Sequence, residues 1–240
     1  MIYHSSIFYP GNRDELLAAV SPIAAGVPHR AFILPHQALQ YSAHLYREAF
    51  ASIPDGTRIV AFLPLHREPL IRDSSSILFS PSEREERTEL GIVRIGSLGY
   101  PSSASYEEEE YSLELLYPFI AYHNPASTLY PVFMHARTSQ DARLLAGITE
   151  ALDDGRTAFI VSSNMTGRGL AEEKVKEERD RTIKAIERGD GLLDQWHKGR
   201  IGACGTPAIE ALQRALRSRW RFAGLGTEER MAGHAYFYMD

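Results

Sequence analysis

The sequence predicts an α/β protein with a central mixed, largely parallel sheet that is flanked by helices on both faces. Short apolar runs alternate along the chain with segments of helical period, as a series of strand-helix units requires. Turn signals such as Pro-Asp-Gly at 54–56 and Asp-Gly at 154–155 separate these segments. A chain of 240 residues can bury a substantial core without disulfides or metals as staples. We therefore expect one domain over residues 1–240.

In the first half of the chain, apolar spacing and turn residues define the elements. Apolar side chains recur at helical spacing after a turn at 8–11, and two apolar runs end in a proline closely followed by a histidine. The polar stretch 67–89 favours a loop with one short strand or helical turn, and the alternation after it favours a strand. In order, we expect a helix at 14–25, a strand from residue 31 to Pro35-His36, a helix to residue 52, and strands at 58–63 and 89–98.

In the second half of the chain, helical segments and buried strands continue to alternate. The glutamates at 107–110 precede an apolar segment, and negative charge there favours the start of a helix over a cation site. Thr206 is the expected N-cap of a late helix, and Pro207 is its expected first residue. In order, we expect a helix at 112–122, a strand at 129–135, a helix at 140–152, a strand at 157–162, helices at 170–188, 192–198 and 206–216, and a strand at 232–239.

Composition argues against several classes of function. The net charge is -5 and the basic residues are scattered, so the sequence has no electrostatic footprint for nucleic acid. No apolar run approaches the roughly 18 residues of a membrane span, and the start of the chain lacks a secretory signal pattern. Neither a GxGxxG nor a GxxxxGKS/T loop supports a nucleotide cofactor. The single cysteine, Cys204, rules out an internal disulfide and fits a reducing compartment, so we expect a cytoplasmic protein.

Two histidines and the cysteine are candidate metal ligands. His36 and His66 both follow the ends of expected strands, and ligands gather at the carboxyl ends of strands in open α/β sheets. Cys204 lies just before a helix start, where the helix dipole favours the thiolate. Two imidazoles and a thiolate leave one coordination position open, and they suit copper, zinc or iron better than magnesium or calcium. His135, at the end of another strand, is a further candidate.

Each of these residues also has a structural interpretation. A histidine after a strand is often a hydrogen-bonded loop residue, and a lone cysteine is often a small buried hydrophobe. Ser163 and Asn164 follow an expected strand without a Gly-x-Ser-x-Gly elbow, so we expect them to form hydrogen bonds at a pocket rim. The remaining histidines have no comparable setting and are interpreted as surface or core residues: His4, His29, His44, His123, His197 and His234.

Seven short motifs occur in a recognisable order along nearly the whole chain. They are FYP at 8–10, PHQALQYS at 35–42, PLH at 64–66, LG at 90–91, EYSLE at 110–114 followed by PF, SSN at 162–164 and CG at 204–205. In this order they resemble the FYP, PHAGYxYSG, GP-S-H, PLG, EHSLE, SSDxSH and Cys-Gly elements of the Memo family. This family is the B component of the AmmeMemoRadiSam proteins.

The resemblance implies a fold similar to that of class III extradiol dioxygenases and a pocket lined by two histidines and one cysteine. It implies binding of copper or iron with redox activity, zinc being less expected, and a radical-SAM or other protein partner. The ligands that match on this chain are His36, His66 and Cys204. The residues expected around them in the pocket are Tyr111, Glu114, Ser163, Asn164 and His135.

The chain departs from the family pattern at the positions that would carry acid-base chemistry. Asn164 and Gly167 stand where the family has an aspartate and a histidine, and Tyr111 stands where it has another histidine. An asparagine cannot act as a carboxylate base, and a glycine has no side chain. Three hypotheses follow: a metal-binding redox protein, a non-catalytic binding or scaffold protein that acts with a partner, and, last, a hydrolase with Cys204 or Ser163 as nucleophile.

Overall fold

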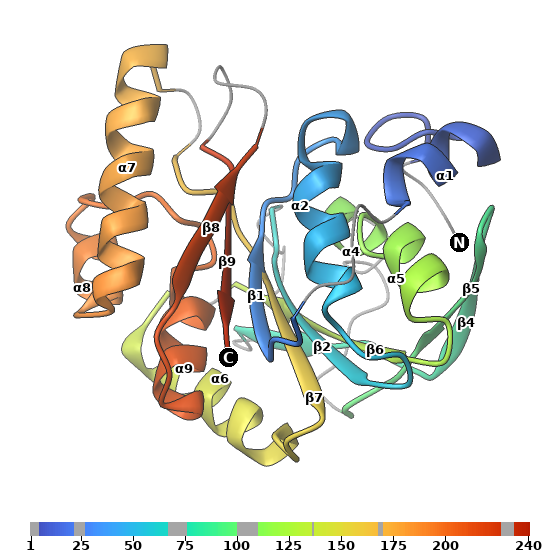
Figure 1. Cartoon of the computed structure of the whole chain (residues 1–240). Coiled ribbons are helices and arrows are strands. Elements are labelled where there is room, and N and C mark those ends of the chain that lie inside the picture. Colours follow the sequence, from blue (N-terminus) through green and yellow to red (C-terminus); the bar gives the residue numbers. More distant parts are fainter. Residues whose placement is uncertain are drawn as a thin grey trace.

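A single mixed sheet crosses the molecule, and helices cover both of its faces (Figure 1). The computed structural model describes residues 5–21, 27–66, 76–99, 110–135, 137–167, 170–226 and 233–240. The strands within these residues are β1 (Ala31–Leu34), β2 (Arg58–Pro64), β3 (Ile77–Phe79), β4 (Arg84–Thr88), β5 (Gly91–Ile95), β6 (Thr128–Met134), β7 (Thr157–Ser162), β8 (Arg221–Leu225) and β9 (Ala235–Met239).

The strand order is β4-β5-β6-β2-β7-β1-β9-β8, and β3 pairs with β6. Parallel pairing joins β5, β6, β2, β7 and β1. Antiparallel pairing adds β9 and β8 at one edge and β4 and β3 at the other. The predicted α/β class, with a mixed, largely parallel central sheet, is therefore confirmed.

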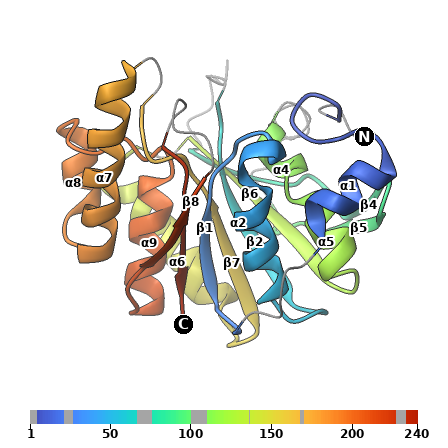
Figure 2. The same cartoon turned by 45° about the horizontal axis from the view of Figure 1, so that its top comes forward.

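The helices form one layer on each face of the sheet (Figure 2). One layer holds α1 (Arg13–Val20), α2 (Leu39–Ala51), α4 (Tyr111–Glu114) and α5 (Tyr117–His123), and the other holds α6 (Ser139–Leu152), α7 (Glu172–Arg188), α8 (Leu192–His197) and α9 (Thr206–Leu216). No helix in the described part of the chain has both the length and the apolar composition needed to cross a membrane.

The central strands are apolar on both faces because a helical layer covers each face. In β1, Phe32 and Leu34 join the core that contains residues of α1, α2 and α5. Ile33, which points to the opposite face, joins the core that contains residues of α6 to α9. Strands buried on both faces read as continuous apolar runs, which explains why these strands were recognisable in the sequence.

Three edge strands escaped sequence prediction. The stretch 67–89 was expected to be a loop with one short strand or helical turn, but its described part holds both β3 and β4, and β8 was not expected at all. β4 has the sequence REERT, and β8 is largely exposed. β4 and β8 lack a hydrophobic face, because pairing with a neighbour rather than burial holds them in place. β3 is apolar and largely buried, but it is only three residues long.

Two helix boundaries also differ from the expectation. The helix expected at 112–122 is two helices, α4 and α5, and Pro118 lies in the first turn of α5, where its missing N–H is tolerated. Gly205, not Thr206, is the N-cap of α9, and the Thr206 hydroxyl donates instead to the Ala203 carbonyl at 2.6 Å. The end of the helix expected at 14–25, the start of the strand at 232 and the glutamates at 107–109 lie outside the described residues.

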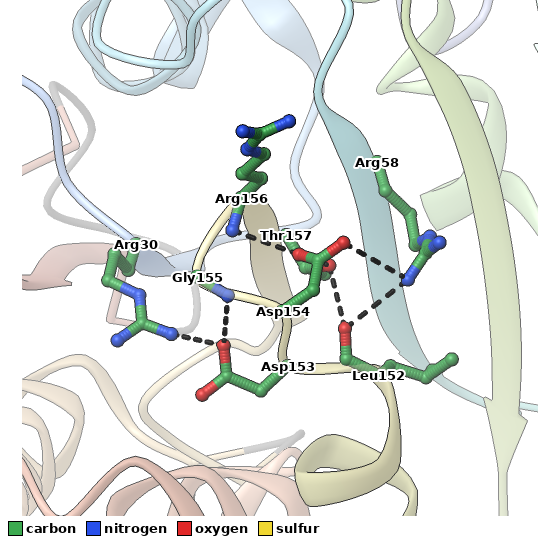
Figure 3. Close-up of polar contacts among 8 residues, drawn as sticks. All are labelled: Arg30, Arg58, Leu152, Asp153, Asp154, Gly155, Arg156 and Thr157. Carbon is green, nitrogen blue, oxygen red and sulfur yellow. Dashed lines mark hydrogen bonds and ion pairs between the residues drawn. The ribbon is translucent and has the colours of Figure 1, made fainter.

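The turn that follows α6 joins the amino-terminal ends of the central strands (Figure 3). The Asp153 carboxylate accepts a hydrogen bond from Gly155 N at 3.0 Å and pairs with Arg30, next to β1. The Asp154 carboxylate lies 3.7 Å from the guanidinium of Arg58 in β2. Exposed ion pairs contribute little stability, so their main effect is to fix the turn. The opposite end of the sheet is the one that carries the candidate ligands.

A capping box begins α6 and provides a test of the fold. The Thr138 hydroxyl accepts from Asp141 N at 3.1 Å, and the Asp141 carboxylate accepts from Thr138 N at 2.8 Å. We expect Thr138→Ala to lower the free energy of unfolding by about 1 kcal/mol, because the cap is lost, and Thr138→Ser to retain most of it. Urea unfolding followed by circular dichroism measures both variants. Equal losses in the two variants would contradict the capping role.

Candidate metal centre

Three of the side chains selected from the sequence meet at the carboxyl ends of the central strands. His36 follows β1, His66 follows β2, and Cys204 precedes α9. The Nε2 atoms of the two histidines lie 3.0 Å apart, and Cys204 Sγ lies 3.7 Å from His36 Nε2. The three ligand atoms all lie within 4.8 Å of one another. We call this group the His-His-Cys trio.

Two of the three separations within the trio are close to those around a single metal ion. With ordinary zinc bond lengths and tetrahedral angles, two ligating nitrogens lie roughly 3.3 Å apart, and a nitrogen and a sulfur roughly 3.6 Å apart. The observed 3.0 Å and 3.7 Å differ from these values by a few tenths of an ångström, and the third pair of atoms lies within 4.8 Å. The trio is thus compatible with one transition-metal ion after side-chain adjustment, and among the described residues it offers three ligands.

A buried carboxylate orients His66. His66 Nδ1 lies 3.0 and 3.1 Å from the two carboxylate oxygens of Glu110, which is 3 % exposed. Because an ionised carboxylate can only accept, Nδ1 donates, and in the neutral imidazole the lone pair is then on Nε2, facing the centre of the trio. Glu110 also accepts from His66 N and Ser112 N, so its own burial is compensated by hydrogen bonds.

Strand β7 orients His36. β7 lies between β1 and β2, so the two histidines come from strands that are not direct neighbours. Ser162, the last residue of β7, has its hydroxyl oxygen 2.9 Å from His36 Nδ1. His36 is 2 % exposed, and with Nδ1 engaged its Nε2 points toward His66 and Cys204. Both histidines thus present the same ring nitrogen to the centre.

An aromatic wall borders the trio. The Tyr111 ring stacks on His66 with centroids 5.2 Å apart and meets the edge of His36 at 5.9 Å. Phe8 stacks on Tyr111 from the other side at 4.3 Å, so the segment before α1 reaches the site. Glu114 contributes indirectly, because its carboxylate accepts from the Tyr9 hydroxyl at 3.2 Å and so fixes that segment.

Close packing between α9 and the end of β7 positions Cys204. The Ser163 hydroxyl accepts from Gly205 N at 3.0 Å and lies 3.7 Å from Cys204 Sγ. A Cβ atom at position 205 would come within 2.8 Å of the side chains of Ser163 and Val161, so only glycine fits. Ser163 is therefore a positioning residue of the cysteine loop, and within the described parts of the chain its hydroxyl has no hydrogen bond to a histidine or carboxylate that could act as a base.

The charges of the trio depend on one another. Burial raises the pKa of the Cys204 thiol, but the charge of His36, hydrogen bonds from both histidines and the Asn164 backbone together hold it well below its usual range. For His66, burial lowers the pKa, and hydrogen bonds to Cys204 and Glu110 outweigh burial and raise it to about 9. The pKa of Glu110 is lowered despite burial, chiefly by its hydrogen bond to His66. Without metal, the favoured state is imidazolium, thiolate and carboxylate.

Sequence reasoning missed a third histidine, which lies near the two of the trio. His234, interpreted above as a surface or core residue, is 3 % exposed and lies directly before β9. Burial, and then the charge of His36, lower its pKa to about 4. β9 runs antiparallel to β1, so it begins at the edge of the sheet where β1 ends. A histidine at the start of the last strand was therefore the sequence signal that pointed to this site.

Other expected pocket residues lie in different settings. His135 follows β6 and is not a member of the trio. Asn164 has its backbone oxygen 4.0 Å from Cys204 Sγ, and its side-chain oxygen is buried without a hydrogen-bond partner among the described residues. Gly167 is exposed, and its N–H donates to Glu178 at 2.9 Å.

Comparisons with known proteins yield one family match and one structural likeness of note. The family model described as Memo-like protein matches residues 2–224. Among solved structures, the chain is similar to the one titled "Crystal structure of uncharacterized protein JW3007 from Escherichia coli K12". That match has 13% sequence identity and a TM-score of 0.45, and it covers 88% of this chain and 100% of the other. A comparison with curated proteins finds no match.

The lowered pKa of Cys204 can be measured directly, because the chain has only one cysteine. In metal-free protein, we expect thiolate absorbance at 240 nm to persist as the pH falls below about 8.5, the ordinary thiol value. Because the charge of His36 is the largest factor that lowers this pKa, His36→Asn should shift the midpoint upward. Cys204→Ser is the blank. A wild-type midpoint at or above the ordinary value would contradict the charge network.

Proposed function

The chain belongs to the Memo-like family, and on that premise we propose that it binds one copper or iron ion through His36, His66 and Cys204 and acts in redox chemistry. The observation that carries the proposal is the convergence of three ligand atoms within 4.8 Å of one another. Three protein ligands and an open position are the pattern of reactive metal sites. When bound, copper or iron supplies one-electron chemistry, and imidazole and thiolate ligands suit both metals.

The surrounding residues support this proposal through what they do to the ligands. Glu110 holds His66 with Nε2 toward the centre, and Ser162 does the same for His36. Partners of this kind raise ligand basicity and fix ring orientation. Tyr111 covers one side of the two imidazoles and limits the access of water from that side.

The proposal includes no acid-base step by the residues that replace the family's aspartate and histidine. Asn164 has an amide, which neither accepts nor releases a proton near neutral pH, and Gly167 is an exposed glycine whose backbone contacts Glu178. The proposed activity is therefore electron transfer or activation of a small ligand at the open position. A reaction that needs a carboxylate base is not part of it.

The partner-binding hypothesis stays a prediction. It was motivated by the replaced acid-base residues, Asn164 and Gly167, and by the acidic run at 107–110. Glu110 is buried against His66 and has a role within the site, and the other three glutamates lie outside the described residues. Binding of a radical-SAM or other protein partner therefore rests on the family resemblance and on the replaced acid-base residues.

Elemental analysis of untagged, anaerobically purified protein tests the metal site. We expect about one equivalent of copper or iron, and loss of this metal in the triple variant His36→Ala/His66→Ala/Cys204→Ala, because all three ligands are removed. The matched control is His135→Ala, which removes a histidine at a neighbouring strand end outside the trio. Equal metal content in wild type and triple variant, or loss in the control alone, would refute the proposed site.

Glu110→Gln tests the outer hydrogen bond separately from the ligands. Removal of a carboxylate that orients a ligating histidine is expected to weaken metal affinity by about 10- to 100-fold. It should also lower the pKa of His66 from about 9, because the hydrogen bond and charge of Glu110 raise it. Competition with a chromophoric chelator gives the affinity, and histidine NMR signals of metal-free protein give the pKa. An unchanged affinity together with a lowered pKa would show that Glu110 serves the metal-free state only.

A further inference from the structure

One buried histidine outside the trio has no assigned role. His234 is 3 % exposed, and neither of its ring nitrogens has a hydrogen-bond partner among the described residues. A buried polar group without a partner is destabilising relative to one that is paired, because it has lost its hydrogen bonds to water. Buried unpaired groups are rare in folded proteins, and each calls for an explanation such as a bound molecule.

The strand register points to His36 as the neighbour of His234. β9 pairs antiparallel with β1, with Ala31 opposite Met239 and Ile33 opposite Phe237, where the ladder ends. Continued by three residues, the same register would set His234 opposite His36, and directly opposed residues of an antiparallel pair point to the same face of the sheet. The two side chains are also close enough to interact electrostatically.

The backbone around His234 is held in place from two sides. Met165 N donates to Gly233 O at 2.8 Å, which joins this segment to the residues after β7. Gly226 N donates to His234 O at 3.0 Å, and a Cβ at position 226 would come within 2.7 Å of the His234 Cβ. The same corner holds two more buried oxygens without partners among the described residues, those of the Asn164 and Thr166 side chains.

We propose that His234 is a ligand-positioning residue, which hydrogen-bonds a hydroxyl-bearing molecule bound next to the His-His-Cys trio. The inference rests on the proposed function, because the molecule is placed at the open side of that metal site. It names a residue and a chemical class that the trio alone does not specify. The hydroxyl group belongs to a small organic alcohol, and the probe below distinguishes this ligand from water alone.

The chemistry of a neutral imidazole favours a hydroxyl ligand. Burial keeps His234 uncharged near neutral pH, so one ring nitrogen donates and the other accepts. Such a ring can hydrogen-bond an oxygen whether that oxygen carries its proton or has lost it, simply by exchange of tautomers. A charged lysine or arginine at this position would only donate, and it would repel a cation held by the trio.

Stability measurements separate a ligand-binding role from a packing role. We expect His234→Leu to leave the midpoint of thermal unfolding unchanged or to raise it, because an apolar side chain of similar size removes an unpaired polar group. His123 provides the contrast, since its Nε2 is paired with the Val20 carbonyl at 2.8 Å. His123→Leu should lower the midpoint. A clear decrease for His234→Leu would assign His234 a structural role.

Binding of 2,2,2-trifluoroethanol, followed by fluorine NMR, tests the ligand class. The probe is compared with its methyl ether, which lacks the hydroxyl, on metal-free and cobalt-loaded protein. We expect wild type to bind the alcohol in preference to the ether. We also expect binding to weaken at least about tenfold in His234→Leu and to be retained within about twofold in His234→Gln, which keeps a donor and an acceptor.

The outcomes distinguish this inference from the proposed function. Cobalt stoichiometry should be the same in wild type, His234→Leu and His234→Gln, because His234 is not a member of the trio. If wild type takes up neither cobalt nor copper or iron, the proposed metal site fails, and the metal-free comparison still decides the role of His234. Equal binding of the alcohol by wild type and His234→Leu overturns the inference. So does equal binding of alcohol and ether by wild type, which would leave water as the only partner.

Discussion

The parallel pairing of β1, β7 and β2 is the constraint on which the site depends. Because the three strands run in one direction, the segments that follow them leave the sheet at the same edge. His36, Ser162 and His66 therefore meet although they are far apart in the sequence. Reversal of any one of these strands would move its terminal residue to the other end of the sheet, where the turn after α6 lies.

Burial of the site has a cost that the network of hydrogen bonds offsets. Glu110 and His36 are almost fully buried, and isolated charges or unpaired imidazoles are unfavourable in such surroundings. Three hydrogen bonds to Glu110 and one to His36 compensate for the lost water. When no metal is bound, the Cys204 thiolate, whose pKa is held low, lies beside the His66 imidazolium, whose pKa is raised. The buried charges of the metal-free site therefore compensate one another.

The sequence was sufficient for the fold class and for the trio, because both follow from local patterns. Buried runs that end in a proline and a histidine marked two strand ends, and a cysteine before a helix marked the third member of the trio. The sequence patterns did not reveal contacts between residues that are far apart in the chain. Glu110 was assigned to a helix start, which it does cap, but its pairing with His66 depends on the packing of α4 against β2. His234 was missed for the same reason, since its position follows from the pairing of β9 with β1.

Because Gly205 lies so close to Ser163, the adjacent positions 204 and 205 are constrained for different reasons. The Cys204 side chain is partly buried and serves the trio, so its replacement acts first on the proposed metal site. Position 205 tolerates no side chain, because any Cβ would overlap the side chains of Ser163 and Val161. The cysteine is thus constrained by the proposed chemistry, whereas the glycine is constrained by the packing of the fold itself.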